Sequence, residues 1–320
     1  MERPAVDEIR AAAERLRGIV AHTPLVPLHA FEPGRSDLLL KVEIHQPVTS
    51  FKLRGVFNAV ACFSGRERRR GLSTVSAGNT AQALAWTGRH FGVPARCLMP
   101  ETAPATKIEA VRSYGGEPVL VPLDELFRYL GEHGWEREPY AFVHPWTNRD
   151  LMIGHGSIGL EILDDLPEVD RVYVPFGGGG LIGGVGSALK GLRPGVRVVA
   201  VEPAGCPALH ESLRQGRPAR VECHTMCDGV AVPYITEEVF PVLRDVVDEV
   251  VLVQEEAVKA AIKRLALRNR IVAEGSGALA VAAALARGQR SRGPAVCLVT
   301  GGSIDTSTLL EILGDPTIPV

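Results

Sequence analysis

Val174-Pro175-Phe176-Gly177-Gly178-Gly179-Gly180-Leu181 is the stretch that decides the fold. An extended apolar run over 171–176 breaks into four glycines immediately before a helical pattern over 181–191. Such a turn lets several backbone N–H groups converge on one anion, and the N-terminus of the following helix adds its positive end. The run predicts a phosphate-binding loop, although a glycine hinge beneath a closely packed helix is the alternative. It lacks the Lys-Ser/Thr ending of a nucleoside triphosphate loop and the spaced glycines of a dinucleotide fingerprint.

The rest of the chain alternates short apolar strands with helical patterns. Strands are expected over 38–43, 73–76, 95–99 and 118–121 and, in the second half, over 171–176, 197–202, 247–253 and 295–300. Such a series indicates an α/β protein with parallel-rich open sheets covered by helices. We expect two lobes: a large, discontinuous domain of residues 1–69 and 148–320, and a small α/β domain of residues 70–147. A ligand should lie in the crevice between them, at the carboxyl ends of the strands.

The composition excludes several classes of protein. With 46% hydrophobic and 22% charged residues over 320 positions, the chain is typical of a globular protein. The formal net charge of -2 provides no positive field for nucleic acid, and the basic run from Arg66 to Arg70 is interpreted as a solvated loop. No apolar stretch approaches the roughly 20 residues that span a bilayer, and no signal-peptide core follows Met1. We therefore expect a cytoplasmic protein with neither a nucleic-acid nor a membrane partner.

The six cysteines are scattered along the chain, at positions 62, 97, 206, 223, 227 and 297. This spread predicts reduced, mostly packed thiols rather than a disulfide framework. One cluster invites a zinc interpretation: Cys223, His224 and Cys227, with Cys206 and His210 upstream. Its spacing matches none of the usual ligand patterns, so no metal is expected.

Three further stretches fall where a doubly wound fold collects its ligand groups. Ser50-Phe51-Lys52 places a lysine at a strand-helix junction, and a lysine amine in an apolar site can lose its proton and form a Schiff base with a carbonyl cofactor. Ser76-Ala77-Gly78-Asn79-Thr80 offers N–H groups and hydroxyls suited to a carboxylate. Thr300-Gly301-Gly302-Ser303 ends the last strong strand. Taken singly, the first two could be a solvated surface lysine and an ordinary helix cap.

The combination of these motifs resembles a known family. Ser50-Phe51-Lys52-Leu53-Arg54-Gly55, Ser76-Ala77-Gly78-Asn79, the 177–180 glycines and Thr300-Gly301-Gly302 are similar to the fold-type II pyridoxal-phosphate (PLP) enzymes, in the branch of serine/threonine dehydratases and serine racemases. The resemblance runs from His22 to Asp305, with the motifs in family order and at family spacing. It implies the two-lobed, tryptophan synthase β-like fold, pyridoxal 5'-phosphate as cofactor, a small amino-acid substrate and a homodimer.

The resemblance also implies a role for each matching residue. Lys52 would be the catalytic Schiff-base lysine, with the Phe51 ring packed on the pyridine and Thr300 facing the ring nitrogen. A neutral hydroxyl there cannot hold a full positive charge on that nitrogen, which favours elimination over chemistry that stores a carbanion. Asn79 would donate to the 3'-oxygen. The remaining implied contacts are to the phosphate from Gly177, Gly178, Gly179, Gly180 and Leu181, to the substrate carboxylate from Ser76, Ala77, Gly78, Asn79 and Thr80, and to the substrate side group from Arg128. A surface position is the alternative for Arg128.

The sequence departs from the family pattern at several positions. Ala77 stands where racemases of the family carry the serine that acts as acid and base opposite the lysine. Ala208 stands where the family's divalent-metal site has an aspartate, although Glu202 of that site is kept. Thr49 replaces a glycine before Ser-Phe-Lys, and a β-branched residue restricts the backbone there. Thr80 replaces a histidine, which suggests a non-standard substrate.

The leading hypothesis is a PLP-dependent lyase of the ammonia-lyase type. It would eliminate water from a β-hydroxy amino acid such as threonine or serine and release a 2-keto acid and ammonia. Two alternatives use the same scaffold: a 3-hydroxyaspartate dehydratase, in which Arg128 would pair with the second carboxylate, and an amino-acid racemase. An alternative of another class is a non-catalytic protein that binds PLP or another phospholigand.

Overall fold

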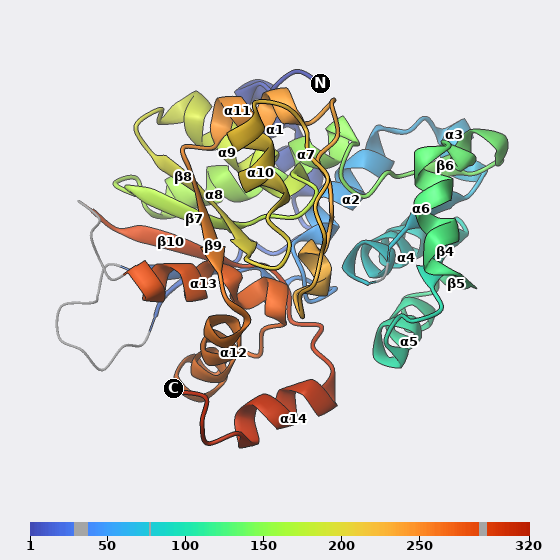
Figure 1. Cartoon of the computed structure of the whole chain (residues 1–320). Helices are drawn as coiled ribbons and strands as arrows, with labels where there is room; N and C mark the ends of the chain where they lie inside the picture. Colours follow the sequence, from blue (N-terminus) through green and yellow to red (C-terminus); the bar gives the residue numbers. More distant parts are fainter. Residues whose placement is uncertain (29–37, 77, 288–292) are drawn as a thin grey trace.

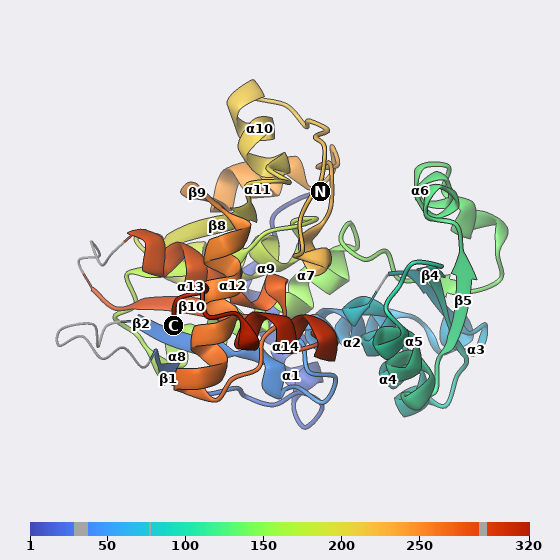
Figure 2. The same ribbon diagram turned by 60° about the horizontal axis from the view of Figure 1, so that its bottom comes forward.

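The structure, a computed structural model, describes residues 1–28, 38–76, 78–287 and 293–320. Within these ranges the chain builds two sheets, each packed against helices, and the sheets lie on opposite sides of the molecule (Figure 1). A second view, turned by 60°, keeps the same separation (Figure 2). The observed sheets and helices confirm the predicted α/β class with parallel-rich sheets.

The larger sheet has six strands within the described ranges, in the order β1-β2-β10-β7-β8-β9. β1 pairs antiparallel with β2, and every other described pairing in this sheet is parallel. In this order the strands are β1 (Leu25–Pro27), β2 (Leu38–Val42), β10 (Ala295–Val299), β7 (Arg171–Pro175), β8 (Arg197–Pro203) and β9 (Glu249–Val253).

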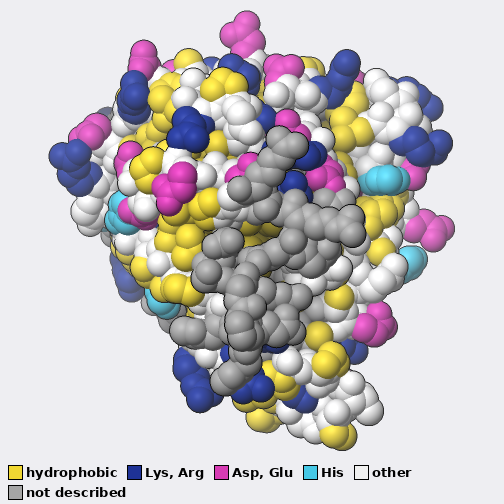
Figure 3. Space-filling model, turned by 90° about the vertical axis from the view of Figure 1, so that its left-hand side faces the viewer, with side chains coloured by type: hydrophobic (Ala, Val, Ile, Leu, Met, Phe, Trp, Pro, Cys, Tyr) yellow, Lys and Arg dark blue, Asp and Glu magenta, His cyan; other side chains and the backbone are white. Residues whose placement is uncertain are grey.

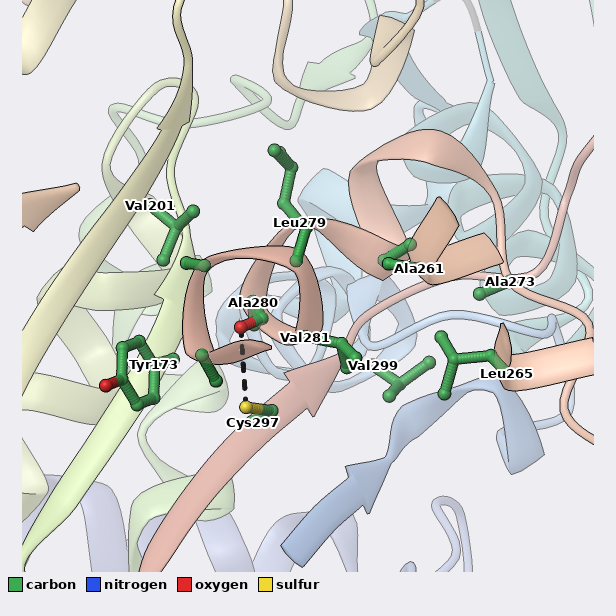
Figure 4. Close-up of a cluster of buried hydrophobic side chains, with 14 of the residues drawn as sticks. Tyr173, Val201, Ala261, Leu265, Ala273, Leu279, Ala280, Val281, Cys297 and Val299 are labelled. Carbon is green, nitrogen blue, oxygen red and sulfur yellow. Dashed lines mark hydrogen bonds between the residues drawn. The ribbon is translucent and has the colours of Figure 1, made fainter. Parts of the chain in front are cut away.

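Helices cover both faces of this sheet, as the continuous apolar strands predict. In β10, Cys297 and Val299 face one cluster of buried side chains, whereas Val296 and Leu298 face the other. Figure 4 shows the first cluster, where the Cys297 thiol donates a hydrogen bond to the Ala280 carbonyl at 3.4 Å. The helical elements around the larger sheet are α1 (Val6–Leu16), η1 (Glu43–His45), α7 (Arg149–His155), α8 (Ser157–Asp165), α9 (Gly180–Leu192), α10 (Ala208–Gln215), η3 (Asp228–Val230), α11 (Phe240–Val246), α12 (Glu255–Arg264), η4 (Leu265–Asn269), α13 (Gly275–Arg287) and α14 (Thr306–Gly314).

The smaller sheet is parallel, with the described strands in the order β5-β4-β3-β6. These are β5 (Glu117–Val121), β4 (Ala95–Pro100), β3 (Leu72–Val75) and β6 (Ala141–Phe142). The helical elements on this side are α3 (Gly65–Arg69), α4 (Asn79–Phe91), α5 (Ala105–Ser113), α6 (Leu123–Gly131) and η2 (Gly134–Arg137). α2 (Lys52–Cys62) contacts both α4 and α7, so it joins the two layers. The domain boundaries at 69/70 and 147/148 stay a prediction.

One local expectation was wrong. The basic run from Arg66 to Arg70 is not a loop, since most of it forms α3. Ser64 and Glu67 form a reciprocal capping box there, which satisfies the free N–H groups of a short helix. Around the larger sheet, α12 ends at Arg264 and continues as the π turn η4. No helix in the described ranges is long and apolar enough to cross a bilayer.

The cysteine prediction was wrong for one pair. Cys206 and Cys223 form a disulfide, while Cys62, Cys97, Cys227 and Cys297 are free thiols. The bond joins the turn after β8 to the segment that precedes η3. Sequence spacing alone could not reveal it, because a pairing depends on which loops the fold brings together. Two of the three cysteines considered for a zinc site, Cys206 and Cys223, are therefore bonded to each other and do not offer thiolates.

We predict that removing this disulfide destabilises the protein. The bond closes a loop with a sequence separation of 17. Freeing a loop of this length is expected to lower the free energy of unfolding by about 3 kcal/mol, in the chain-entropy description. Urea unfolding of the Cys223→Ser variant tests this, with Cys62→Ser as the matched control at a free thiol. A thiol titration of unfolded wild type should find four free thiols, and finding six would contradict the assignment.

Candidate active site

A cavity of about 700 Å³ lies at the carboxyl ends of strands from both sheets. Its walls include Val75 at the end of β3, Pro100 at the end of β4, Pro175 at the end of β7 with the residues that follow it, and Thr300 directly after β10. The volume falls within the range of small-molecule and cofactor sites. The predicted position of the ligand crevice, between the two layers at the strand ends, is therefore confirmed.

The segment before α2 is fixed to the end of β10. The Phe51 N–H donates to the Thr300 carbonyl at 3.1 Å, and the Gly302 N–H donates to the Thr49 carbonyl at 3.0 Å. Because β2 and β10 are neighbours in the sheet, both strand ends deliver their loops to one edge. As a result, Lys52 and Thr300 both line the cavity although they are far apart in the sequence.

A buried ionic cluster holds the first turn of α2. Arg54 is fully buried, donates to Glu43 from Nε at 2.7 Å, and donates to Glu161 from Nη1 at 2.6 Å. Removing one partner from such a cluster would leave a buried charge unpaired, which is costly, so the geometry is strongly determined. The start of α2, and with it the Lys52 backbone, is therefore held in place by residues that do not line the cavity.

The Lys52 amine lies in the cavity, 5.0 Å from the centroid of the Phe51 ring. Loss of solvation lowers the pKa of Lys52 to about 8, although the charge of Glu274 acts in the opposite direction. A lysine with this pKa carries a useful fraction of free amine near neutral pH. The position and the pKa are those of a nucleophile.

A second lysine lines the same cavity but has the opposite character. Lys107 on α5 is buried, forms an ion pair with Asp228, and lies 3.9 Å from Glu274. Burial alone would lower its pKa, but the two carboxylates outweigh this effect and the pKa of Lys107 is raised. Lys107 therefore stays protonated, and its charge is already compensated.

The glycine loop passes closely against its surroundings. A Cβ atom on Gly178 would lie 2.4 Å from Cγ of Trp146, and Gly179 has φ +90°, a conformation that side chains rarely adopt. Gly177, Gly178, Gly179, Gly180 and Leu181 all line the cavity. The first turn of α9 follows immediately, and its N–H groups have no partners within the helix. This arrangement fits the phosphate of a ligand.

Buried polar atoms without partners mark where the rest of a ligand would lie. Within the described ranges these include Oδ1 of Asn79, Oε2 of Glu274 and Oγ of Ser276, all from residues that line the cavity. Nδ2 of Asn79 donates to Oε1 of Glu274 at 2.6 Å. Buried polar groups are normally hydrogen-bonded, so their gathering around one cavity points to a polar ligand. A phosphorylated pyridine with an oxygen substituent fits this set.

The structure brings most of the predicted site residues together. Those that line the cavity are Phe51, Lys52, Ser76, Gly78, Asn79, Thr80, Gly177, Gly178, Gly179, Gly180, Leu181 and Thr300. The role assigned to each stays a prediction. Ala77 lies outside the described residues.

The expectation that Arg128 contacts the substrate is corrected, because Arg128 does not line the cavity. Its side chain is 62% exposed and lies 3.8 Å from Glu125 on the same helix. One residue corresponds to a turn of about 100° around a helix, and the preceding residue, Phe127, is the one that lines the cavity. The proposed contact with a second substrate carboxylate therefore has no support.

Sequence reasoning missed Glu274, Lys107, Asp228 and His155, all of which line the cavity. Glu274 precedes the small-residue run Gly275-Ser276-Gly277, which is a visible signal for a loop close to a ligand. The others become apparent only once the two layers are placed together. The buried His155 packs beneath Phe51, with ring centroids 4.7 Å apart, and loss of solvation keeps its pKa well below the ordinary value.

Glu202, the retained residue of the family's metal site, has local partners. It accepts hydrogen bonds from the N–H groups of Leu209 at 2.7 Å and His210 at 2.9 Å, in α10. Burial raises its pKa to about 7, against these two bonds. Over the described ranges, no group of three His, Cys, Asp or Glu side chains is placed to hold a metal ion.

Thr49 explains how the chain accommodates its departure from the family glycine. Its φ is +54°, in the left-handed region that favours glycine and that β-branched residues rarely adopt. The carbonyl contact with Gly302 and a 3.3 Å contact between the Thr49 and Ser303 hydroxyls fix this conformation. The lysine loop therefore keeps a glycine-like turn at the cost of local strain.

The comparisons with known proteins agree with this geometry. The sequence profile of the family described as "Pyridoxal-phosphate dependent enzyme" matches residues 16–301. An L-threonine ammonia-lyase of Geobacter sulfurreducens is 40% identical over 95% of this chain and 77% of its own length. A catabolic L-threonine dehydratase of Escherichia coli is 34% identical over 97% of this chain and 96% of its own. Among solved structures, maize serine racemase matches with a TM-score of 0.89 and 31% identity, over 97% of each chain.

We predict that Thr49→Gly stabilises the protein. Strain of this kind costs about 1–3 kcal/mol, whereas the extra freedom of glycine in the unfolded chain costs about 0.4–1 kcal/mol. The free energy of unfolding in urea should therefore rise by about 1 kcal/mol. Thr49→Ala is the matched control, since it removes the hydroxyl but keeps the strained φ, and it should give no gain. A Thr49→Gly protein less stable than wild type would contradict this interpretation.

Proposed function

Because the chain belongs to the family of pyridoxal-phosphate-dependent enzymes, we propose that it is a lyase that eliminates water from a β-hydroxy amino acid. The products are a 2-keto acid and ammonia. The observation that carries the proposal is the Lys52 amine, which lies in the cavity with a pKa of about 8 beside the glycine loop.

Each side of the cavity has a task in this reaction. When bound, PLP withdraws electrons from the substrate and makes its α-proton acidic. Lys52 holds the cofactor in the resting enzyme and, once freed, takes the α-proton on Nζ. Gly177 to Gly180 and the start of α9 bind the phosphate, and the loop from Ser76 to Thr80 binds the substrate carboxylate.

The remaining polar groups orient the cofactor and control charge. Thr300 would present a neutral hydroxyl to the ring nitrogen, and in the structure this hydroxyl donates a hydrogen bond to the Ser276 carbonyl at 3.4 Å. Asn79 would donate a hydrogen bond to the 3'-oxygen of the cofactor. Its amide also donates a hydrogen bond to the Glu274 carboxylate, which fixes its orientation. Burial raises the pKa of Glu274, whereas the charge of Lys107 acts in the opposite direction.

The alternatives are less well supported. A racemase requires an acid-base group opposite Lys52, and the sequence has Ala77 at that position. A 3-hydroxyaspartate dehydratase requires a free cation for the second carboxylate. Among the described residues, the lysine and arginine side chains that line the cavity are Lys52 and Lys107, and Lys107 is already paired. A non-catalytic phospholigand protein would not need a lysine amine with a lowered pKa.

We also propose that the enzyme works in the cytoplasm as a homodimer, without nucleic acid. On the face shown in Figure 3, basic and acidic side chains are interspersed rather than gathered into one basic patch. Leu267, Val272 and Leu310 are exposed apolar residues of the kind that a second copy would cover. The four free thiols are typical of a reducing compartment such as the cytoplasm, whereas a disulfide such as Cys206–Cys223 is uncommon there.

We predict that Lys52→Ala abolishes the elimination. Loss of the residue that anchors the cofactor and moves the α-proton should lower kcat for keto-acid release by at least about 10³-fold. The visible-edge absorbance of the PLP-loaded protein should change as well. Lys190→Ala is the matched control, because Lys190 of α9 pairs with Asp248 and does not line the cavity. The activity of this variant should stay within about twofold of wild type. A Lys52→Ala enzyme with substantial turnover would refute the assignment.

The pKa of Lys52 predicts how cofactor uptake depends on pH. The free amine is the reactive form, so its fraction rises about tenfold per pH unit below the pKa and levels off above it. The rate at which PLP attaches to the apoenzyme should therefore rise toward pH 8 and then reach a plateau. Stopped-flow absorbance measures this rate. A rate that still rises tenfold per unit above pH 9 would indicate an ordinary, solvated lysine instead.

A further inference from the structure

The cavity extends beyond the residues that hold the cofactor, onto one face of α6. Four α6 residues line it: Leu123, Leu126, Phe127 and Leu130. Their spacing of i, i+3, i+4 and i+7 places them on a single side of the helix. We call this set the apolar wall. Leu126 and Leu130 are buried, but Leu123 is 51% exposed and Phe127 is 39% exposed, so the wall presents uncovered apolar surface.

The surroundings of the apolar wall are also apolar. Trp146 packs against the same buried cluster as Leu126 and Leu130, and it lines the same cavity. The Trp146 ring is held by an edge contact to Tyr234, with centroids 6.2 Å apart, so it is a fixed part of the wall's surroundings. The charged neighbours Glu125 and Arg128 lie on other sides of α6, outside the cavity walls. Apart from the Nε1–H of Trp146, which is buried and has no hydrogen-bond partner, the side chains around the apolar wall offer little to a charged or strongly polar group.

The wall shares one cavity with Lys52, which limits what can occupy it. A substrate whose α-carbon is at Lys52 and whose carboxylate is at the loop from Ser76 to Thr80 has only its side chain free to extend further. The single methyl group of threonine is small compared with the four large apolar side chains of the wall. Apolar surface that is left in contact with water contributes nothing to binding, whereas a larger side chain would cover it.

We propose that the substrate is a β-hydroxy amino acid with a bulky apolar group, aryl or alkyl, on its β-carbon, and that this group packs against the apolar wall. The inference rests on the proposed function and names its substrate class. The reaction balances as follows: the Cα–H and Cβ–OH bonds break, and water leaves. One water is then consumed when the nitrogen departs as ammonium, so the 2-keto acid keeps the apolar group.

The first test is a substrate series of one configuration: L-serine, L-threonine, 3-hydroxynorvaline and 3-phenylserine. Each added methylene should raise kcat/KM about fourfold, and 3-phenylserine should exceed serine by about 10- to 100-fold. A kcat/KM that is flat or falls beyond threonine overturns the inference while leaving the proposed function intact.

A binding measurement separates the two proposals. L-alanine, L-norvaline and L-phenylalanine lack a β-hydroxyl, so their Kd values can be obtained from absorbance changes of the holoenzyme without any turnover. The inference expects Kd to fall in that order, and a Kd that does not fall overturns it. Tightening of Kd without keto-acid release from any β-hydroxy amino acid supports the apolar wall and refutes the elimination.

Two variants locate the effect on α6. Leu123→Ser and Phe127→Ser should each lower kcat/KM for 3-phenylserine about tenfold or more and change that for serine less than twofold. Leu120→Ser is the matched control, because Leu120 is 42% exposed on β5 but does not line the cavity, and neither substrate should be affected. Equal losses for serine and 3-phenylserine in Leu123→Ser and Phe127→Ser would overturn the assignment of the wall.

Discussion

The buried carboxylate of Glu274 is the point at which the two layers of the molecule meet. It accepts a hydrogen bond from Asn79 of α4 and lies 3.9 Å from Lys107 of α5, while its own N–H donates to the Gly301 carbonyl beyond β10. A buried charge is tolerated only when it is paired and hydrogen-bonded. Together with α2, these contacts hold the helices of the smaller sheet against the strand ends of the larger one, where the cavity lies.

The two lysines near the Glu274 carboxylate have pKa values shifted in opposite directions. Lys107 is compensated by Glu274 and Asp228, so its pKa is raised, whereas Lys52 is desolvated with only partial compensation and its pKa falls to about 8. Environments that push the pKa values of neighbouring groups apart are a general way of assigning acid and base roles. Here they favour the free amine at Lys52, as the proposed role of Lys52 requires, and the cation at Lys107, which pairs with Asp228 of η3.

Much of this organisation could be predicted from the sequence. The strand-to-helix turns at Lys52, Asn79 and Gly177 carry local signals: apolar runs that break into glycine, serine or asparagine before a helical pattern. In parallel sheets such turns share one edge, so their meeting in a cavity follows from topology. The fold class and the residues of these loops can therefore be inferred from the amino-acid pattern alone.

The remainder depends on tertiary contacts. Lys107 and Asp228 are ordinary polar residues in sequence and become site residues only through their pairing. The expected position of Arg128 was wrong by a single step around α6: Phe127 lines the cavity and Arg128 does not, which removes the support for the diacid alternative. The Cys206–Cys223 bond likewise reflects which loops meet at the end of β8.

The most direct test is to identify the lysine to which the cofactor attaches. The protein is saturated with PLP, reduced with borohydride, digested, and mapped by mass spectrometry. We expect a phosphopyridoxyl group on Lys52, with Lys107 unmodified although both lysines line the same cavity. Modification of Lys107 in place of Lys52, or of neither, would contradict the assignment of Lys52 as the nucleophile.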